Sequence, residues 1–313
     1  MTEHHLPATP STATQVLSRD TPPVLRVAPG DRVVVESLDA SGHLERQATP
    51  GAGTRYRFPD RRGHALTGPI EVAGAVPGDV LAVRFDALDP ADWGWTVAGR
   101  RDDAFARSLG LDGADPAWLL WDLDREAGTA TDQYGHVVRL APFLGLVGLP
   151  PAEPGEHSTT PPRAAGGGNI DCRALTAGST LFLPVTVPGA LLHLGDGHAA
   201  QGDGEVGGTA IECGMTTTVT LDLVRDPPVS GIHAVTPTAR ITFGFDADLN
   251  RATSEALGAM LTWLQLLHGL ERKAALALAG AVVDLRVTQI ANQTWGVHAV
   301  LGLDAVGAAV GAA

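Results

Sequence analysis

The stretch Pro77-Gly78-Asp79-Val80-Leu81-Ala82-Val83-Arg84 joins a tight turn directly to a short apolar run. Glycine after proline supplies the positive φ of a type II turn, and the Val- and Leu-rich run that follows favours a strand. Residues 29–36 repeat this arrangement 48 residues earlier, with Pro29-Gly30-Asp31 ahead of Arg32-Val33-Val34-Val35-Glu36. The two segments predict similar strand units, although one pair of matches is weak evidence for duplication.

Short apolar segments separated by turn residues continue along most of the chain, which contains 38 Gly and 22 Pro. Residues 179–187, 190–194 and 216–224 predict further strands. Residues 150–168 are rich in proline, glycine and threonine, and they predict a long loop that joins two β-rich halves. We therefore expect a mainly β fold, a sandwich or barrel.

Helical periodicity is confined to the region near the C-terminus. Asp246 or Asp248 would serve as an N-cap and Gly269 as a stop. Between them, apolar residues recur at intervals of three and four, at Leu257, Met260, Leu261, Leu264 and Leu267. A second helix over 271–279 and a strand over 282–290 complete the pattern, which predicts a C-terminal helical insert capping the β architecture.

Length and charge limit the classes of function. The 313 residues carry 22 Lys+Arg and 35 Asp+Glu, so the net charge is 22 − 35 = −13. No basic cluster is available to neutralise phosphates, and nucleic acid is excluded as a partner. Residues 1–22 are polar and proline-rich, without the pattern of a signal peptide, and predict a flexible N-terminus ahead of a single domain over 23–313. No apolar stretch reaches the ~20 residues of a membrane span, so we expect a cytoplasmic protein.

Residue usage also limits the chemistry. Lys273 is the only lysine, and its surroundings suggest a solvated helix face, which argues against mechanisms that need a lysine. Cys172 and Cys213 cannot form a disulfide framework or a four-thiolate zinc site, and we expect both to be buried apolar groups. No Gly-x-Ser-x-Gly or His-Glu-x-x-His motif is present. Any chemistry must rest on carboxylates and histidines, with or without a metal.

The densest group of such residues lies between positions 166 and 212. In extended backbone, Asp196 and His198 project to one side, and so do Asp203 and Glu205. Oxygen and imidazole ligands of this kind suit Zn²⁺ or another divalent first-row ion. A glycine-rich surface turn has the same composition, so the residues alone leave both interpretations open.

Residues 202–207 also match the dinucleotide-binding pattern Gly-x-Gly-x-x-Gly formally. That motif places a pyrophosphate on a helix N-terminus, whereas here two acids would repel the phosphates. The residues that follow favour strands, and nucleotide binding is therefore excluded.

Several motifs taken together resemble the acetamidase/formamidase family, in chain order over nearly the whole sequence. They are Thr67-Gly68-Pro69-Ile70 with Pro77-Gly78-Asp79-Val80-Leu81, Gly167-Gly168-Asn169-Ile170-Asp171, Leu181-Phe182-Leu183-Pro184-Val185, Gly189-Ala190-Leu191, Gly195-Asp196-Gly197-His198-Ala199-Ala200-Gln201-Gly202-Asp203-Gly204-Glu205, and Val283-Asp284-Leu285-Arg286-Val287-Thr288-Gln289. The resemblance implies an amidase that hydrolyses short aliphatic amides to a carboxylate and ammonia. It also implies a β-rich fold, a homo-oligomer and a divalent metal, with zinc as first choice and calcium as the alternative.

The resemblance assigns roles to particular residues. It implies metal ligation by Asp171, Asp196, His198, Glu36 and Asp39 and places Asn169 at the substrate. An amide also needs a group that takes a proton from water and delivers one to the leaving nitrogen. Glu205 is our first choice for this proton carrier, and Asp203 is the second.

Two positions depart from the family pattern. Gly166 stands where His-Gly-Gly-Asn-x-Asp would place a histidine, and Gly63-His64-Ala65 replaces the usual Asn-Pro-Ala. The missing histidine keeps a second interpretation open, in which the chain is a non-catalytic β-rich module that binds a metal or small ligand.

Overall fold

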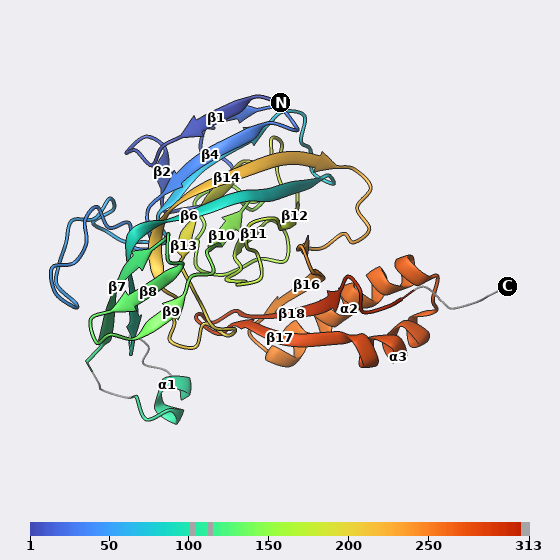
Figure 1. The fold of residues 1–313 in the computed structure, drawn as a ribbon. Coiled ribbons are helices and arrows are strands. Elements are labelled where there is room, and N and C mark those ends of the chain that lie inside the picture. Colours follow the sequence, from blue (N-terminus) through green and yellow to red (C-terminus); the bar gives the residue numbers. More distant parts are fainter. Residues whose placement is uncertain (100–103, 112–114, 308–313) are drawn as a thin grey trace.

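The computed structural model describes residues 1–99, 104–111 and 115–307. Its strands form one network of hydrogen-bonded pairs, most of them antiparallel (Figure 1). In chain order the strands are β1 Glu3–Leu6, β2 Ala13–Thr14, β3 Leu25–Val27, β4 Arg32–Ser37, β5 Leu66–Val72, β6 Val80–Ala98, β7 Ala117–Asp124, β8 Thr129–Asp132, β9 Val137–Arg139, β10 Phe143–Gly148, β11 Gly167–Asn169, β12 Thr180–Pro184, β13 Leu192–His198, β14 Glu212–Val224, β15 His233–Val235, β16 Ala239–Asp246, β17 Val283–Gln289 and β18 Trp295–Gly302. The helices are α1 Ala104–Ser108, α2 Leu249–His268 and α3 Arg272–Val282. The expected mainly β fold class is confirmed.

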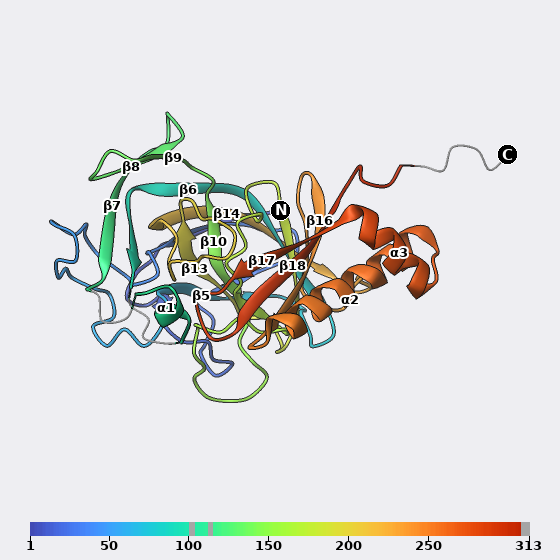
Figure 2. The same cartoon turned by 90° about the horizontal axis from the view of Figure 1, so that it is seen from below.

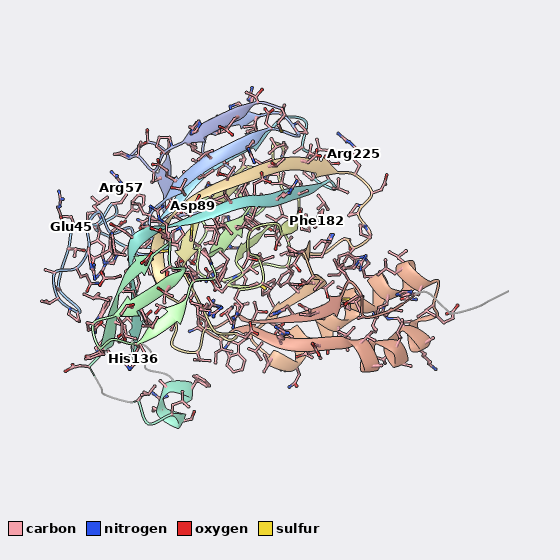
Figure 3. All side chains as sticks on the ribbon, in the orientation of Figure 1. Glu45, Arg57, Asp89, His136, Phe182 and Arg225 are labelled. Atoms are coloured by element: carbon pink, nitrogen blue, oxygen red, sulfur yellow. The ribbon has the colours of Figure 1, made fainter. Side chains whose placement is uncertain are left out.

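Two long strands, β6 and β14, form the centre of the sheet. They pair antiparallel from Val80 opposite Val224 to Trp95 opposite Glu212, with two register shifts between. β4 pairs with β14, while β12 and β7 pair with the two ends of β6. In Figure 3, His136 in the β8–β9 turn and Arg225 after β14 mark opposite ends of this sheet. The strand predicted at 80–84 is only the first part of β6, because aspartates later in β6 interrupt its apolar pattern.

Strand β13 is the junction that positions the site. It pairs antiparallel with β10, with β5 and, at its end, with β14. All seven of its residues are buried, including the charged ones. A strand that is covered on every side holds its side chains firmly, which suits a preorganised site.

The N-terminal residues do not lie free of the domain, contrary to the expected flexible segment 1–22. β1 pairs in parallel with β4, and β2 pairs with β5. Leu6 is 4% exposed and Leu17 is fully buried. The segment joins the core because its few apolar side chains fit between strands, a long-range effect that polar composition hides.

The C-terminal helices pack beside strands β16, β18 and β17, as expected of a helical insert. Figure 2 shows α2 and α3 together, on the side of the molecule away from β7–β9. Asp248 caps α2 by accepting from the Asn250 amide, and Gly269 ends the helix with φ 63°. A Cβ at Gly244 would lie 2.0 Å from the Ala252 carbonyl oxygen, so the glycine lets α2 approach β16 closely. Sequence reasoning missed β18, which separates β16 from β17.

Several single-residue expectations are confirmed. Cys172 and Cys213 are free, buried thiols, and burial raises the pKa of Cys172 to about 12 and that of Cys213 further. Lys273 is exposed on α3. Within the described residues, none of the helices combines the length and hydrophobicity that a bilayer crossing requires.

Two buried histidines should lower the free energy of unfolding at acid pH. Burial lowers the pKa of His193 and of His298 from 6.5 to about 4. The unfolded chain therefore takes up these protons first, and stability falls as the pH drops from 6.5 towards 4, by up to about 3 kcal/mol per histidine. Urea unfolding at pH 7 and pH 5 should show a weaker pH dependence in His193→Gln than in wild type. His268→Gln, at an exposed position, should not differ from wild type.

Candidate active site

Five titratable side chains, which we call the buried cluster, come together around strand β13. They are supplied by the end of β11, by β13, by the turn over 202–208 and by the start of β14, and they are Asp171, Asp196, His198, Glu205 and Glu212. Every one is at most 6% exposed. Their ligand atoms form two groups that share His198, and within each group the atoms lie within 4.8 Å of one another.

Strand pairing explains how residues distant in sequence meet. His198 lies opposite Glu212 in the β13–β14 pair, so both side chains project to the same face. His198 Nε2 lies 3.4 Å from Asp196 Oδ1 and 3.4 Å from Glu212 Oε2. Asp196 and His198 therefore project to the same side, as expected.

Backbone strain is concentrated at the same residues. Of the six non-glycine residues that the described chain holds at positive φ, three belong to the buried cluster: Asp171 at 54°, Asp196 at 61° and Glu205 at 44°. Each such residue costs on the order of 1–3 kcal/mol and persists only where the surrounding structure imposes it. The strain turns these carboxylates inward and is typical of a functional site.

The polar atoms of the buried cluster have few partners. Both Asp171 carboxylate oxygens, both His198 ring nitrogens, Asp196 Oδ1, Glu205 Oε2 and Glu212 Oε2 are buried without a hydrogen bond. Four carboxyl groups and one imidazole cannot all be charged in such a volume without compensation. This donor set, in which several polar atoms lack a hydrogen bond and negative charge is in excess, fits a divalent cation.

The pKa values reflect the same crowding. Burial, followed by the charge of Asp196, raises the pKa of Asp171 well above its usual range. Burial also raises the pKa of Glu205, with Asp171 adding to the effect, and raises that of Glu212 to about 7. Burial opposes the charged form of His198, but Glu212 and Asp196 outweigh it and raise its pKa. At Asp196, burial is likewise opposed by the charge of His198, which together with the charge of His64 and with hydrogen bonding lowers the pKa of Asp196.

A glycine leaves the space at the centre of the buried cluster. A Cβ on Gly145 of β10 would lie 2.6 Å from Asp196 Oδ2, 2.7 Å from Asp171 Oδ1 and 2.7 Å from His198 Cε1. Any side chain there would occupy the volume between the ligand atoms. The absence of a side chain is thus part of the site.

Two amide side chains border the buried cluster. Asn169 is 5% exposed and its Oδ1 has no partner, as a substrate contact requires. Gln201 donates to the Asp171 carbonyl oxygen at 2.8 Å and so helps to hold the strained backbone. Gln201 was not singled out from the sequence, because a neutral amide carries no catalytic signature.

The turn that carries Glu205 is fastened to the end of β17. The Gly204 amide donates to the Thr288 carbonyl oxygen at 3.0 Å, and the Ile290 amide donates to the Gly204 carbonyl oxygen at 2.8 Å. The C-terminal part of the chain therefore helps to position Glu205.

Three residues expected at the site lie outside the buried cluster. The Asp203 side chain is 32% exposed and 3.7 Å from Arg286 Nη1, because 202–208 forms a turn rather than a strand and separates it from Glu205. Glu36 is exposed on β4. Asp39 is buried, but its oxygens lie 3.0 and 3.2 Å from His43 Nδ1. Conversely, Glu212 belongs to the buried cluster, although the sequence around it indicates only a strand and no role in a site.

The two departures from the family pattern, at Gly166 and His64, differ in where they lie relative to the buried cluster. A Cβ at Gly166 would lie 3.1 Å from the Leu149 carbonyl oxygen and 3.4 Å from the Thr186 methyl group, neither of which is in the buried cluster. His64 hydrogen-bonds Thr159 Oγ1 through Nδ1 at 3.0 Å, and its charge is among those that lower the pKa of Asp196. His64, rather than Gly166, is therefore the departure that adjoins the cluster.

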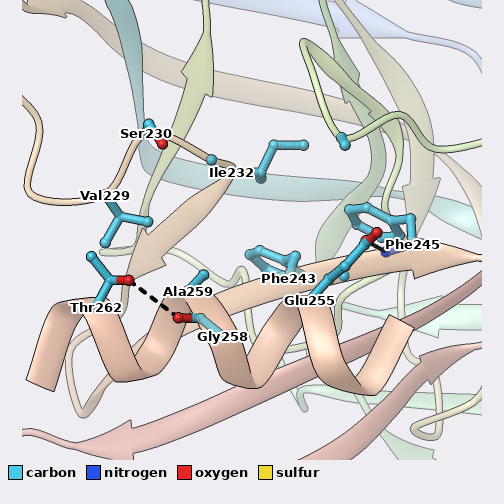
Figure 4. A pocket seen from close by; sticks show the side chains of 12 residues that line it. Val229, Ser230, Ile232, Phe243, Phe245, Glu255, Gly258, Ala259 and Thr262 are labelled. Carbon is cyan, nitrogen blue, oxygen red and sulfur yellow. Dashed lines mark hydrogen bonds between the residues drawn. The ribbon is translucent and has the colours of Figure 1, made fainter. Parts of the chain in front are cut away.

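One pocket is lined by a residue of the buried cluster, and a second is lined by His64 but by none of the cluster. The first, which we call the Glu205 pocket, has a volume of about 470 Å³, includes Glu205 and Gln201 and is largely apolar. The second, of about 430 Å³, is lined by His64 and Trp95 and is more polar. A third pocket, of about 360 Å³, lies beside α2 (Figure 4), where Glu255 accepts from the Phe245 amide at 3.2 Å. None of the buried cluster lines this third pocket.

Comparison with known proteins identifies the family of this chain. The profile of the Acetamidase/Formamidase family matches residues 10–156 and 152–302. The formamidase of Methylophilus methylotrophus is 27% identical over 283 residues, covering 71% of this chain and 68% of that protein. The crystal structure of an acetamidase from Bacillus halodurans superposes with a TM-score of 0.85 at 26% identity, covering 96% of this chain and 97% of the other. The acetamidase from Yersinia enterocolitica gives a TM-score of 0.83 at 27% identity, covering 96% and 92%. The chain therefore belongs to the acetamidase/formamidase family and is an amidase, a hydrolase of amide C–N bonds.

Proposed function

We propose that this protein hydrolyses short aliphatic amides of the formamide and acetamide kind with the help of a divalent metal ion in the buried cluster. One observation carries the proposal: Asp171, Asp196 and His198 are buried around the space above Gly145, and most of their side-chain polar atoms have no hydrogen-bond partner. Membership of an amidase family sets aside the alternative of a non-catalytic binding module.

Asp171, Asp196 and His198 are the proposed ligands, because their ligand atoms lie within 4.8 Å of one another. When bound, a divalent ion would activate water and polarise the amide carbonyl, the two functions that an unreactive amide requires. Zinc is our first choice because of the imidazole, and calcium is the alternative because carboxylate oxygens predominate. Glu36 and Asp39 are not proposed as ligands, since neither is part of the cluster.

The remaining residues position the substrate and move the proton. Glu205 lines the pocket with an unpartnered Oε2, and its carboxylate would take a proton from water and then deliver that proton to the leaving nitrogen. Burial raises the pKa of Glu205, which helps the carboxyl to hold the proton between the two transfers. Asn169 Oδ1, also unpartnered, would accept a hydrogen bond from the substrate amide. The cluster is closed off from bulk water, which strengthens each of these interactions.

The test combines metal analysis with release of ammonia from formamide and acetamide. The purified protein should contain a divalent metal and release ammonia. His198→Ala should lose most of the metal, because water does not replace an imidazole held by its neighbours. His268→Ala, on the exposed end of α2, serves as the matched control. Unchanged metal content in His198→Ala would show that the metal assignment is wrong.

We further propose that the protein acts as a homo-oligomer in the cytoplasm. Exposed apolar side chains on the C-terminal unit, including Leu266, Leu276 and Leu285, support association through apolar surface rather than charge pairing. Two free thiols are consistent with a reducing compartment.

A further inference from the structure

The Glu205 pocket is larger than a formamide or acetamide molecule needs. Its volume is about 470 Å³, whereas each water molecule in liquid occupies only about 30 Å³ and formamide has three heavy atoms. Pockets of several hundred Å³ are typical of sites that enclose larger ligands. Glu205 lines this pocket, so a substrate that reaches Glu205 through it could extend well beyond the amide group.

The wall next to Glu205 is apolar. Trp121 and Ile211 line it and are 5% and 6% exposed. The polar end of the Trp121 ring is already satisfied, since Nε1 donates to Thr96 Oγ1 at 3.0 Å. What these residues offer a ligand is therefore hydrocarbon surface, which suits a methylene chain.

The same pocket also carries two arginines, Arg139 and Arg173. Both are exposed, and in the part of the chain that the structure describes neither side chain has an ion pair or hydrogen bond. Several other arginines on this chain of net charge −13 are paired with carboxylates, such as Arg26 with Glu71 and Arg55 with Glu45. Guanidinium groups are well suited to bind a carboxylate. Two arginines without carboxylate partners in one pocket therefore favour an anionic ligand.

We propose that the preferred substrate is the monoamide of a dicarboxylic acid. Its amide would lie at Glu205, its methylene chain against Trp121 and Ile211, and its free carboxylate between Arg139 and Arg173. Hydrolysis adds one water across the C–N bond and yields the dicarboxylate and ammonium, with no other reactant. This inference rests on the proposed function and makes it more specific.

The test compares matched amides. Succinamate, glutaramate and adipamate are each assayed beside the neutral amide in which a methyl group replaces the carboxylate. We expect the best carboxylated amide to have a kcat/KM about tenfold above its neutral counterpart, the factor given by 1.4 kcal/mol. The ratio should fall towards one in the Arg139→Gln, Arg173→Gln double variant and should decrease with salt. Arg251→Gln, which removes an exposed arginine from α2, controls for net charge and should keep the ratio.

Calorimetric binding of glutarate gives a readout that does not require turnover. Wild type should bind glutarate more tightly than butyrate, and the double variant should lose this preference. The inference would be overturned if charged and neutral amides had equal kcat/KM and if glutarate bound equally well to wild type and to the double variant. If the protein still hydrolysed formamide and acetamide in that case, the proposed function would remain supported. If glutarate binding depended on the two arginines but no amide were hydrolysed, the pocket would be supported as a carboxylate-binding site and the proposed function would be overturned.

Discussion

Gly145→Ala should abolish amide hydrolysis and bound metal together. The added Cβ would lie 2.6 to 2.7 Å from atoms of Asp196, Asp171 and His198, well inside van der Waals contact. All three side chains are buried, and the backbone of Asp171 and of Asp196 is strained, so they cannot move aside without losing their common geometry. We expect a loss of turnover on the order of 10³-fold or more, since misplacing reacting groups by about 1 Å already costs on the order of 10²-fold.

Metal analysis and ammonia release on the same preparation measure this effect. Gly280→Ala is the matched control, because a Cβ there meets no atom within 4 Å and alanine favours the α3 helix. Circular dichroism would show whether Gly145→Ala folds. A folded variant with normal metal content and turnover would mean that the space above Gly145 has no role.

Glu205→Gln should keep the metal and lose turnover. The amide preserves size and shape but cannot carry the proton, so the rate should fall by on the order of 10²–10⁴-fold, with little change in substrate affinity. Steady-state kinetics with acetamide would show the change in kcat, and metal analysis would show the unchanged content.

Asp203→Asn provides the comparison, because Asp203 is two residues away, partly exposed and outside the buried cluster. It should have little effect on kcat. Loss of metal in Glu205→Gln would make Glu205 a ligand and leave Glu212, its neighbour in the cluster, as the next candidate for the proton carrier. Full turnover in Glu205→Gln would remove the residue from the mechanism.

Local patterns predicted the elements whose signals are local. The cap at Asp248, the stop at Gly269 and the apolar spacing of α2 were all readable, because each acts within a few residues. The placement of β1 in the sheet could not be predicted from local sequence, because its pairing with β4 depends on contacts far along the chain. The full length of β6 was hidden for a related reason: aspartates on its exposed side break the apolar pattern, while backbone pairing with β14 continues.

The same distinction applies to the site. Asp196 and His198 were recognised because two-residue spacing in a strand places them on one face. Asp203 was wrongly grouped with Glu205, because that rule fails in a turn. Glu212 joins the cluster through cross-strand pairing with His198, and no sequence spacing encodes that pairing. The unpaired arginines of the Glu205 pocket carry no local motif at all, since their shared lining of one cavity exists only in the fold.

The fastening of Gly204 to Thr288 and Ile290 has a consequence for the order of events during synthesis. Thr288 leaves the ribosome 84 residues after Gly204, when Asp171, Asp196, His198 and Glu212 have already been made. A nascent chain can thus complete its proposed metal ligands long before the turn bearing Glu205 is secured. Amidase activity should therefore be the last property acquired during synthesis, and it would report that the C-terminal strands have docked.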